Sequence, residues 1–203
     1  MTPDSDVTAE PDWRTELPTL VLRQVTLREL GPSDLGPLVD LLSTMDATRF
    51  GLEEPDPEVA AQQLIERAAQ VRSAGAGFTY AITIGARRAF VGLIQMRQLD
   101  PSFEAAECEC TLAPSSRGTG VFLEAARLAG SFAFGRVGAH RVEARVLLQN
   151  GRGNGALKKL GAVQEGVLRR AVRRGDEYLD QVLWSILKED WGDHWVSVAP
   201  RVH

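Results

Sequence analysis

The chain has 203 residues, of which 44% are hydrophobic and 25% are charged. This composition is that of an ordinary globular domain and excludes a disordered or fibrous chain. A chain of this length can bury roughly 70% of its unfolded surface, so its core needs no disulfide or metal for support. The net charge of −4 argues against a general nucleic-acid-binding domain, because such domains are usually basic.

The two ends of the chain differ in composition from the middle. Residues 1–18 are acidic and polar without an apolar segment, so they are not a signal peptide, and we expect a flexible leader. No run approaches 18 apolar residues, so no membrane span is expected. Residues 19–191 then form one domain, followed by a tail at 192–203. We expect a cytoplasmic protein without a nucleic-acid or membrane partner.

The two cysteines, Cys108 and Cys110, are separated by one residue. On a strand they would point to the same face, about 7 Å apart. Bridged cysteines usually have Cα atoms closer than this, so a disulfide is not expected. No histidine lies nearby in sequence to complete a metal site. We predict two buried, reduced thiols and no metal.

The first half of the chain predicts one strand, two helices and three further strands. Residues 20–30 alternate between apolar and polar, which is typical of a half-buried strand. Ser33 is a suitable N-cap for a first helix, whose apolar positions are Leu35, Leu38, Val39, Leu41 and Leu42. Pro57 begins a second helix that ends near Ala74, with one side made by Val59, Leu64, Ile65 and Ala68. The strands that follow are expected at 78–84, 90–97 and 105–112.

The second half predicts a helix, a strand, a short helix and a closing hairpin. An apolar helix is expected at 121–134 and a strand at 142–148, followed by the turn Asn150-Gly151. A short helix then ends with Gly161 as its C-cap. Two strands at 163–170 and 178–187 are joined by a turn at 174–176. This order predicts an α+β domain with a mixed sheet rather than a doubly wound fold.

The stretch Ser115-Ser116-Arg117-Gly118-Thr119-Gly120 lies between a strand and a helix. Two glycines let the backbone approach a ligand, and the helix directs its first N–H groups and its positive end at that place. Arg117 adds a charge that suits a phosphate. The third glycine of a dinucleotide fingerprint is absent, as is a Walker A loop. A phosphate or pyrophosphate site is predicted, with a tight strand–helix turn as the alternative.

Residues 20–191 resemble the GNAT N-acetyltransferase superfamily, in particular its RimJ/RimL-type branch of ribosomal-protein alanine N-acetyltransferases. The resemblance depends on several fragments in order: Leu22-Arg23 through Asp34, Gly118-Thr119-Gly120 through Glu124-Ala125, Asn150-Gly151-Arg152, Leu160-Gly161 through Arg169, Tyr178-Leu179-Asp180 and Trp184-Ser185 through Trp191. It implies a single-domain GNAT fold, with a splayed, mostly antiparallel seven-stranded sheet and about four helices.

The resemblance also implies acetyl-CoA or another acyl-CoA as the cofactor. Its pyrophosphate would lie on the backbone of Arg117, Gly118, Thr119, Gly120 and Val121. The pantetheine arm would follow the strand edge formed by Cys110, Leu112 and Ala113. Asn150 would bond the pantetheine, and Asn154 or Lys159 would approach the far end of the cofactor. For Asn150, the alternative is a type I′ turn residue.

Acyl transfer to an amine requires a base, and Glu107 and Glu109 are the candidates. Both belong to the strand beside the proposed pantetheine site and share one face. If that face lined the cleft, burial and mutual repulsion would raise at least one carboxyl pKa into a useful range. The alternative is a solvated strand face. We take Glu109 as the preferred base.

Two departures from the family pattern concern the remaining chemistry. The serine or tyrosine that protonates the leaving thiolate in relatives is replaced here by Gly153 and Leu157. Water must then supply the proton, or the protein binds or senses acyl-CoA without turnover. The residue that begins the pyrophosphate loop is Ser115 rather than Gln or Arg, with Arg117 close by.

The resemblance implies a primary amine as acceptor, on a protein N-terminus or a small molecule, and a possible homodimer. Tyr178, Asp180 and Arg170 are the candidate substrate residues, and a hydrogen-bonded structural pair is the alternative for the first two. The nearby cations are either a solvated turn or a rim for an acidic group: Arg169, Arg170, Arg173 and Arg174. A nucleotide-binding protein that uses the same loop is the third reading of the chain.

Overall fold

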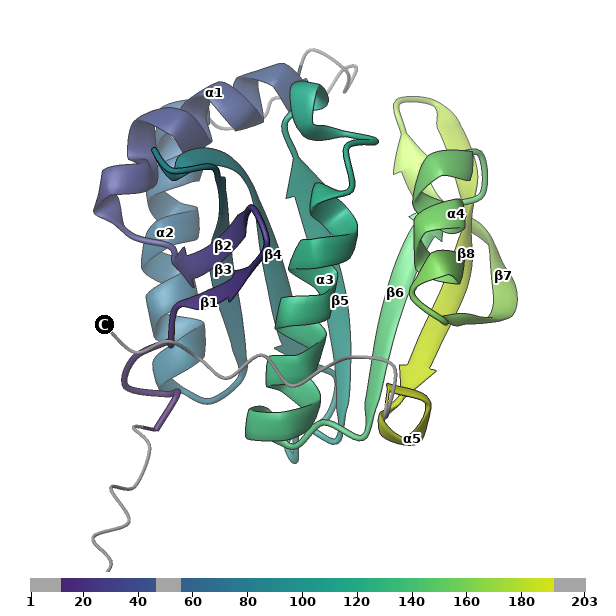
Figure 1. The fold of residues 1–203 in the computed structure, drawn as a ribbon. Helices are drawn as coiled ribbons and strands as arrows, with labels where there is room; N and C mark the ends of the chain where they lie inside the picture. The colour runs from purple at the N-terminus through teal and green to yellow at the C-terminus, as the bar shows by residue number, and fades with distance from the viewer. Residues whose placement is uncertain (1–11, 47–55, 192–203) are drawn as a thin grey trace, which may run out of the picture.

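A computed structural model describes residues 12–46 and 56–191 (Figure 1). The strands are β1 Leu20–Leu22, β2 Val25–Glu29, β3 Gly77–Ile84, β4 Ala89–Gln98, β5 Ala105–Leu112, β6 Arg141–Leu147, β7 Val163–Arg174 and β8 Glu177–Leu187. The α-helices are α1 Leu35–Asp46, α2 Pro57–Ser73, α3 Val121–Phe132, α4 Gly151–Lys159 and α5 Lys188–Trp191. None of the helices in these described ranges is long and apolar enough to cross a membrane.

All eight described strands belong to one sheet, in the order β1-β2-β3-β4-β5-β6-β8-β7. Neighbouring strands are antiparallel except β5 and β6, which are parallel. The helix α3 connects those two parallel strands (Figure 1). The predicted α+β class with a mixed, mostly antiparallel sheet is confirmed.

The eighth strand arises because the strand predicted at 20–30 is a hairpin. Arg23 has a φ of +50° and turns the chain, so that Leu22 pairs with Val25 and Leu20 with Leu27. The turn has only two residues, so the apolar positions of both strands stay on the same face of the sheet. The apolar positions shift from Leu20 and Leu22 to Val25 and Leu27, with the two polar residues Arg23 and Gln24 between them. The alternation therefore breaks at the turn, and the prediction of a single strand is wrong.

The start of α1 also differs from the prediction. Ser33 lies inside a 3₁₀ turn, Pro32–Asp34, and is not an N-cap. Asp34 supplies the capping interaction instead, because its buried carboxylate accepts a 3.0 Å hydrogen bond from the Gly31 N–H. The same carboxylate accepts hydrogen bonds from both terminal nitrogens of Arg28, and this interaction raises the pKa of the Arg28 guanidinium.

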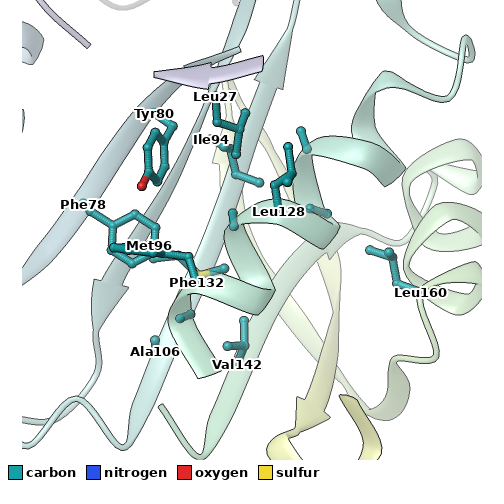
Figure 2. Close-up of a cluster of buried hydrophobic side chains, with 14 of the residues drawn as sticks. Leu27, Phe78, Tyr80, Ile94, Met96, Ala106, Leu128, Phe132, Val142 and Leu160 are labelled. Carbon is teal, nitrogen blue, oxygen red and sulfur yellow. The ribbon is translucent and has the colours of Figure 1, made fainter. Parts of the chain in front are cut away.

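The larger core lies between α3 and one face of the sheet (Figure 2). Phe78 and Tyr80 of β3 contact Phe132 of α3 in edge-on geometry, with ring centroids 5.0 Å and 5.8 Å apart. The helices α1 and α2 cover the opposite face over β2 to β4, where Leu38, Leu41, Ala61, Ala81 and Leu93 are buried. Val59, which was predicted on the buried side of α2, is 47% exposed, and Ala61 takes that place.

The described part of the predicted leader packs against this core. Trp13 and Leu17 are buried, and the Trp13 ring lies 5.9 Å from Phe103 and 6.2 Å from Phe78 between centroids. The prediction that residues 1–18 are all flexible is therefore wrong for this part, and the packed domain begins before residue 19. Residues 1–11 and the predicted tail, 192–203, lie outside the described residues.

The two cysteines behave as predicted. Cys108 and Cys110 are free thiols, half-buried, and they pack against the main core on the α3 side of the sheet. Burial raises the pKa of the Cys108 thiol to about 12 and the pKa of the Cys110 thiol well above its usual value. Both are therefore protonated at neutral pH, which makes them poor nucleophiles.

Candidate active site

The strands β5 and β6 separate after a short ladder. They pair only at Ala105–Glu107 against Arg141–Glu143. Beyond this point β5 continues to pair with β4 as far as Leu112, and β6 continues to pair with β8 as far as Leu147. The sheet is therefore splayed between β5 and β6, as predicted. The edge of β5 that was predicted for pantetheine, including Cys110 and Leu112, faces this opening (Figure 1).

The glycine-rich loop follows β5 directly and begins α3. Gly118 and Gly120 have φ values of +81° and +92°, and a Cβ atom at either position would have nothing within 4 Å. The backbone conformation, rather than crowding, therefore requires glycine at both positions. The Thr119 hydroxyl donates to the Ser116 carbonyl at 2.7 Å, and Arg117 Nε donates to the Leu112 carbonyl at 3.0 Å. These two bonds hold the loop over the end of β5.

The loop presents unused hydrogen-bond donors. The helical hydrogen bonds of α3 begin with the Glu124 N–H, which donates to the Gly120 carbonyl at 3.2 Å. Among the hydrogen bonds of the described residues, none uses the N–H groups of residues 118–121. These donors lie at the positive end of a twelve-residue helix, which is the arrangement that binds phosphate groups. The site fits the pyrophosphate of an acyl-CoA.

An apolar groove lies between α3 and α4, on the α3 side of the split in the sheet. It is narrow and partly open to solvent. Its lining includes Phe122 and Ala126 of α3, Cys108 of β5, Ala144 of β6 and Leu157 of α4. Almost no polar atoms line the groove, so it suits an apolar group rather than a charged one.

The asparagines of α4 are engaged with the protein. Asn150 is the N-cap, since its Oδ1 accepts from the Gly153 N–H at 3.0 Å, and its φ of −82° excludes a type I′ turn. The side chain of Asn154 donates to the Leu147 carbonyl at 3.0 Å and accepts from Trp184 Nε1 at 2.8 Å. Both ends of its amide are thus occupied, so Asn154 joins α4 to β6 and β8 rather than extending toward a ligand.

Lys159, the other residue predicted near the far end of the cofactor, is exposed in the last turn of α4. A nine-residue helix is roughly 13 Å long, so Lys159 and Asn150 lie at opposite ends of α4. A ligand that lies along this helix would therefore meet Asn150 and Lys159 with different parts of its length. Gly161 follows the helix with a φ of +86°, next to the C-cap Leu160.

The two candidate bases, Glu107 and Glu109, lie on the sheet face away from α3 and have different surroundings. Glu107 is 14% exposed and is ion-paired with Arg97 of β4 and Arg145 of β6. Glu109 is exposed, and its carboxylate accepts a 3.4 Å hydrogen bond from Gln95 Nε2. We expected burial of these carboxylates if their strand face lined the cleft. Glu107 is partly buried, whereas Glu109 is not.

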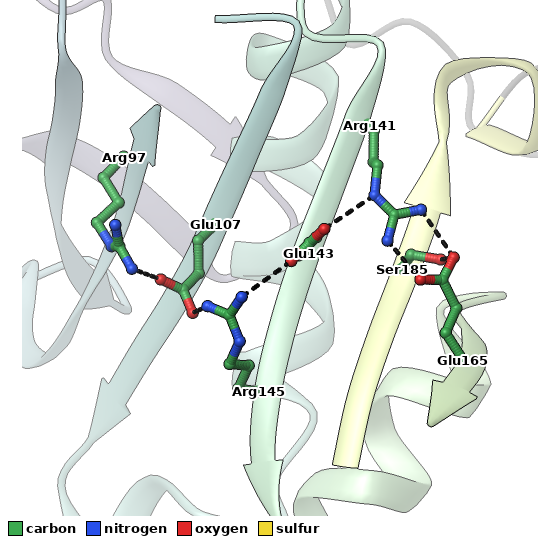
Figure 3. A network of polar contacts seen from close by, with 7 residues as sticks. All are labelled: Arg97, Glu107, Arg141, Glu143, Arg145, Glu165 and Ser185. Carbon is green, nitrogen blue, oxygen red and sulfur yellow. Dashed lines mark hydrogen bonds and ion pairs between the residues drawn. The ribbon is translucent and has the colours of Figure 1, made fainter. Parts of the chain in front are cut away.

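The pairs at Glu107 belong to a longer chain of charges across the sheet (Figure 3). Arg145 also donates to Glu143 at 3.2 Å, and Glu143 accepts from Arg141 at 3.0 Å. Arg141 donates to both carboxylate oxygens of Glu165, at 2.7 Å and 2.5 Å. The Ser185 hydroxyl donates to Glu165 at 2.7 Å. Sequence reasoning missed this chain, although the charges at 141, 143 and 145 on one strand face were a signal for it.

The candidate substrate residues lie on the β7–β8 hairpin. Asp180 Oδ1 accepts from the Arg170 N–H at 2.7 Å, and Arg170 has a φ of +52°. Leu168 pairs with Gln181 and Val172 with Leu179, so three residues of β7 oppose Asp180 alone. Asp180 therefore stabilises a β-bulge, a feature that changes the direction of side chains near functional sites. Tyr178 is 56% exposed beside it.

The bulge lies next to the end of β6. The Leu148 N–H donates to the Asp180 carbonyl at 2.9 Å, which places the hairpin beside the open end of the split. No pattern in the sequence indicated the bulge itself. Among the described residues, no group of three or more His, Cys, Asp or Glu side chains is placed to hold a metal ion.

A split mixed sheet with an anion-binding loop at the start of the following helix defines a class of acyl-CoA-dependent transferase folds. The family model for the acetyltransferase (GNAT) domain matches residues 24–163, and the chain belongs to this family. The chain is thus a member of a family of N-acetyltransferases, whose acyl donor is acetyl-CoA.

Individual relatives agree with this assignment. The chain is 26% identical over 172 residues to the uncharacterized N-acetyltransferase YoaA of Bacillus subtilis, covering 84% of this chain and 97% of YoaA. Its fold is similar to that of Mycobacterium smegmatis RimJ, solved in complex with CoA-disulfide, with a TM-score of 0.73, 20% identity and coverage of 83% and 84%. The ribosomal-protein-S5-alanine acetyltransferase of Vibrio fischeri gives a TM-score of 0.74, 17% identity and coverage of 86% and 99%.

The charge chain predicts a pH-dependent contribution to stability at Glu165. The hydrogen bonds from Arg141 and Ser185 lower the pKa of this carboxyl to about 2, whereas an unfolded glutamate has a pKa of about 4.3. The contribution is therefore present above pH 5 and is lost as the pH falls toward 2. In thermal unfolding, the Tm difference between the native protein and Glu165→Gln should be largest at neutral pH and shrink between about pH 5 and pH 2. The same substitution at the exposed Glu177 should change Tm little at any pH, and a Glu165 difference independent of pH would contradict the assignment.

Proposed function

We propose that this protein binds acetyl-CoA with the pyrophosphate on the loop at residues 117–121 and the pantetheine arm in the split between β5 and β6. There it would acetylate a primary amine. The observation that supports this best is that the ladder between β5 and β6 stops at Glu107, so that β5 from residue 108 to its end at Leu112 has no partner strand on this side as it approaches the loop. One continuous path thus leads from the phosphate donors to the open strand edge.

Several residues of this path would hold the cofactor. Gly118, Thr119, Gly120 and Val121 supply the N–H groups, and Arg117 adds a positive charge at the same place. The edge of β5 at Cys110 and Leu112 would supply backbone groups for the arm. Ala113 does not fit the predicted role, because its N–H donates to the Val91 carbonyl and its own carbonyl accepts from the Ser116 N–H. Asn150 lies at the start of α4, on the other side of the split, and Lys159 lies at the far end of that helix. Asn154 supports this arrangement by fixing α4 to β6 and β8.

The cofactor supplies an acetyl thioester, which is activated toward attack by an amine. The amine must first lose its proton, and Glu109 is the base that we propose. Its carboxylate lies on β5 beside the split and has only Gln95 as a described side-chain partner, so it can accept a proton directly or through water. Glu107, by contrast, is held between two guanidinium groups, which makes it a poor base.

The proton for the leaving thiolate would come from water. Gly153 and Leu157 stand where relatives have a serine or a tyrosine, and neither carries a proton donor. If water cannot fulfil this role, the protein binds or senses acyl-CoA without turnover. Consumption of the acetyl-CoA thioester in the presence of amines distinguishes the two functions.

The acceptor that we propose is a protein N-terminus, with a small primary amine as the second candidate. The similarity to RimJ and to the S5-alanine acetyltransferase favours the former. The hairpin residues Arg170, Tyr178 and Asp180 would border the acceptor, because the bulge lies beside the end of β6. The protein would act in the cytoplasm as a homodimer.

A charge substitution at Thr119 tests the anion-binding loop. Thr119→Glu places a carboxylate among the pyrophosphate donors, and like charges at close range cost several kcal/mol. We expect the Kd for CoA in isothermal titration calorimetry to rise by about 100-fold or more. The control Thr119→Gln has the same size without the charge, and its Kd should stay within about tenfold of the native value. Equal affinities of the two variants would mean that the phosphates bind elsewhere.

The role of Glu109 is tested by removing its charge. Glu109→Gln should lower kcat by about 10² to 10⁴, the usual range for loss of a general base, while the Kd for acetyl-CoA stays unchanged. The exposed Glu104, just before β5, provides the matched control Glu104→Gln, which should keep full activity. An unchanged kcat in Glu109→Gln, measured from pH 6 to 9 by release of free thiol, would exclude this residue as the base.

A further inference from the structure

The ion pair between Arg145 and Glu107 lies where β5 and β6 separate. Glu107 is the last residue of β5 in the ladder, and its partner in register on β6 is Glu143. Arg145 is two residues further along β6, beyond the last pair. Its guanidinium nevertheless contacts Glu107 as well as Glu143 (Figure 3). The ion pair therefore crosses the vertex of the split diagonally.

The strand register shows that Arg145 could have had a different carboxylate as its partner. If the parallel ladder continued, Arg145 would lie opposite Glu109, which is also a carboxylate and is on the same face. Arg145 instead reaches back to Glu107, and Glu109 contacts Gln95. The side chains thus tie the two strands at the end of the ladder, and they leave the open edge of β5 without a link to β6.

The environment makes this tie stronger than an ordinary surface pair. Glu107 and Glu143 are each only 14% exposed, and Arg145 is 31% exposed. A partly buried carboxylate that loses its partner keeps its desolvation cost. The backbone ladder it supports has only three paired positions on each strand, so one side-chain tie is a large share of what joins β5 to β6.

We propose that Arg145 and Glu107 act as a brace that sets the opening between β5 and β6, and that both are positioning residues for acyl-CoA. The brace holds the two strands together at the vertex and fixes the distance between their free edges above it. This role rests on the proposed function, because the opening matters to activity only if the pantetheine arm occupies it.

The same carboxylate offers a matched control. Arg97 of β4 also pairs with Glu107, but β4 and β5 are joined by a continuous ladder that extends from Gln98 to Gly92 on β4. Arg145→Gln and Arg97→Gln each remove one guanidinium from Glu107, yet only Arg145→Gln removes a link across the split. A general effect of losing an ion pair should appear in both variants.

Two measurements on the full chain test the brace. The first is amide hydrogen exchange of residues 105–107 and 141–143 without ligand, which reports local opening of the ladder. We expect about tenfold faster exchange in Arg145→Gln and less than about twofold change in Arg97→Gln. The second is the Kd for CoA, which should rise about tenfold in Arg145→Gln and stay within about twofold in Arg97→Gln.

The results also distinguish a failure of the brace from a failure of the proposed function. Equal effects in the two variants, or no effect of Arg145→Gln on exchange, would overturn the brace. If the native protein itself did not bind CoA, the proposed function would fail, while the exchange comparison would still decide on the brace. Arg145→Lys keeps the charge but lacks the planar group that contacts both Glu107 and Glu143. Arg145→Lys should fold even if Arg145→Gln does not. Its amide exchange should be faster than in the native protein and in Arg97→Gln, and slower than in Arg145→Gln. Exchange at the native rate in Arg145→Lys would overturn the two-partner brace.

Discussion

The early end of the β5–β6 ladder is the constraint on which the rest of the site depends. A parallel pair that stopped later would satisfy the backbone groups of Cys108 to Leu112 within the sheet and leave none for a ligand. Because pairing stops at Glu107, the same strand that forms the centre of the sheet also presents a free edge. The helix α3 then packs on one face of β5, and its N-terminus lies at the end of that edge. Fold and site are thus consequences of one local break in a ladder.

The charged side chains around this break have two different roles, because most of them pair with one another across the strands and Glu109 does not. The arginines of β4 and β6 are engaged with Glu107, Glu143 and Glu165 on the face away from α3. Glu109 remains outside that chain and is exposed. On the α3 side the groove is apolar, and the donors for an anion are backbone N–H groups rather than lysines. An acidic protein can bind a polyphosphate cofactor this way, because the positive potential is local.

The sequence predicted the elements whose signals are local. The ranges of β3, β4 and β5 agree with prediction to within a residue because alternation and turn residues bound each strand. The hairpin at Arg23 was missed, although the adjacent polar residues Arg23 and Gln24 interrupt the alternation of the predicted strand. Trp13 and Leu17 were not predicted to belong to the core, because the sequence around them is acidic and rich in proline. For the site, two glycines before an apolar helix predicted the turn that the structure shows at Gly118 and Gly120, and the binding of an anion there stays a prediction.

The contacts that decide side-chain roles depend on residues far apart in sequence. Glu107 was a plausible base until its partners were known, and those partners are 10 and 38 residues away. Asn154 was a plausible ligand contact, but its partner Trp184 lies 30 residues further along the chain. Sequence spacing places such residues on the correct element and face. It does not reveal which neighbours from other strands already occupy their polar atoms.

The most direct test of the whole account is a crystal structure of the protein with CoA bound. We predict pyrophosphate oxygens within hydrogen-bonding distance of the N–H groups of Gly118 to Val121, and the pantetheine arm between the free edges of β5 and β6. The Arg145–Glu107 pair should be intact at the vertex. CoA bound on another surface, or a β5–β6 ladder that closes beyond Glu107 in the complex, would contradict the account.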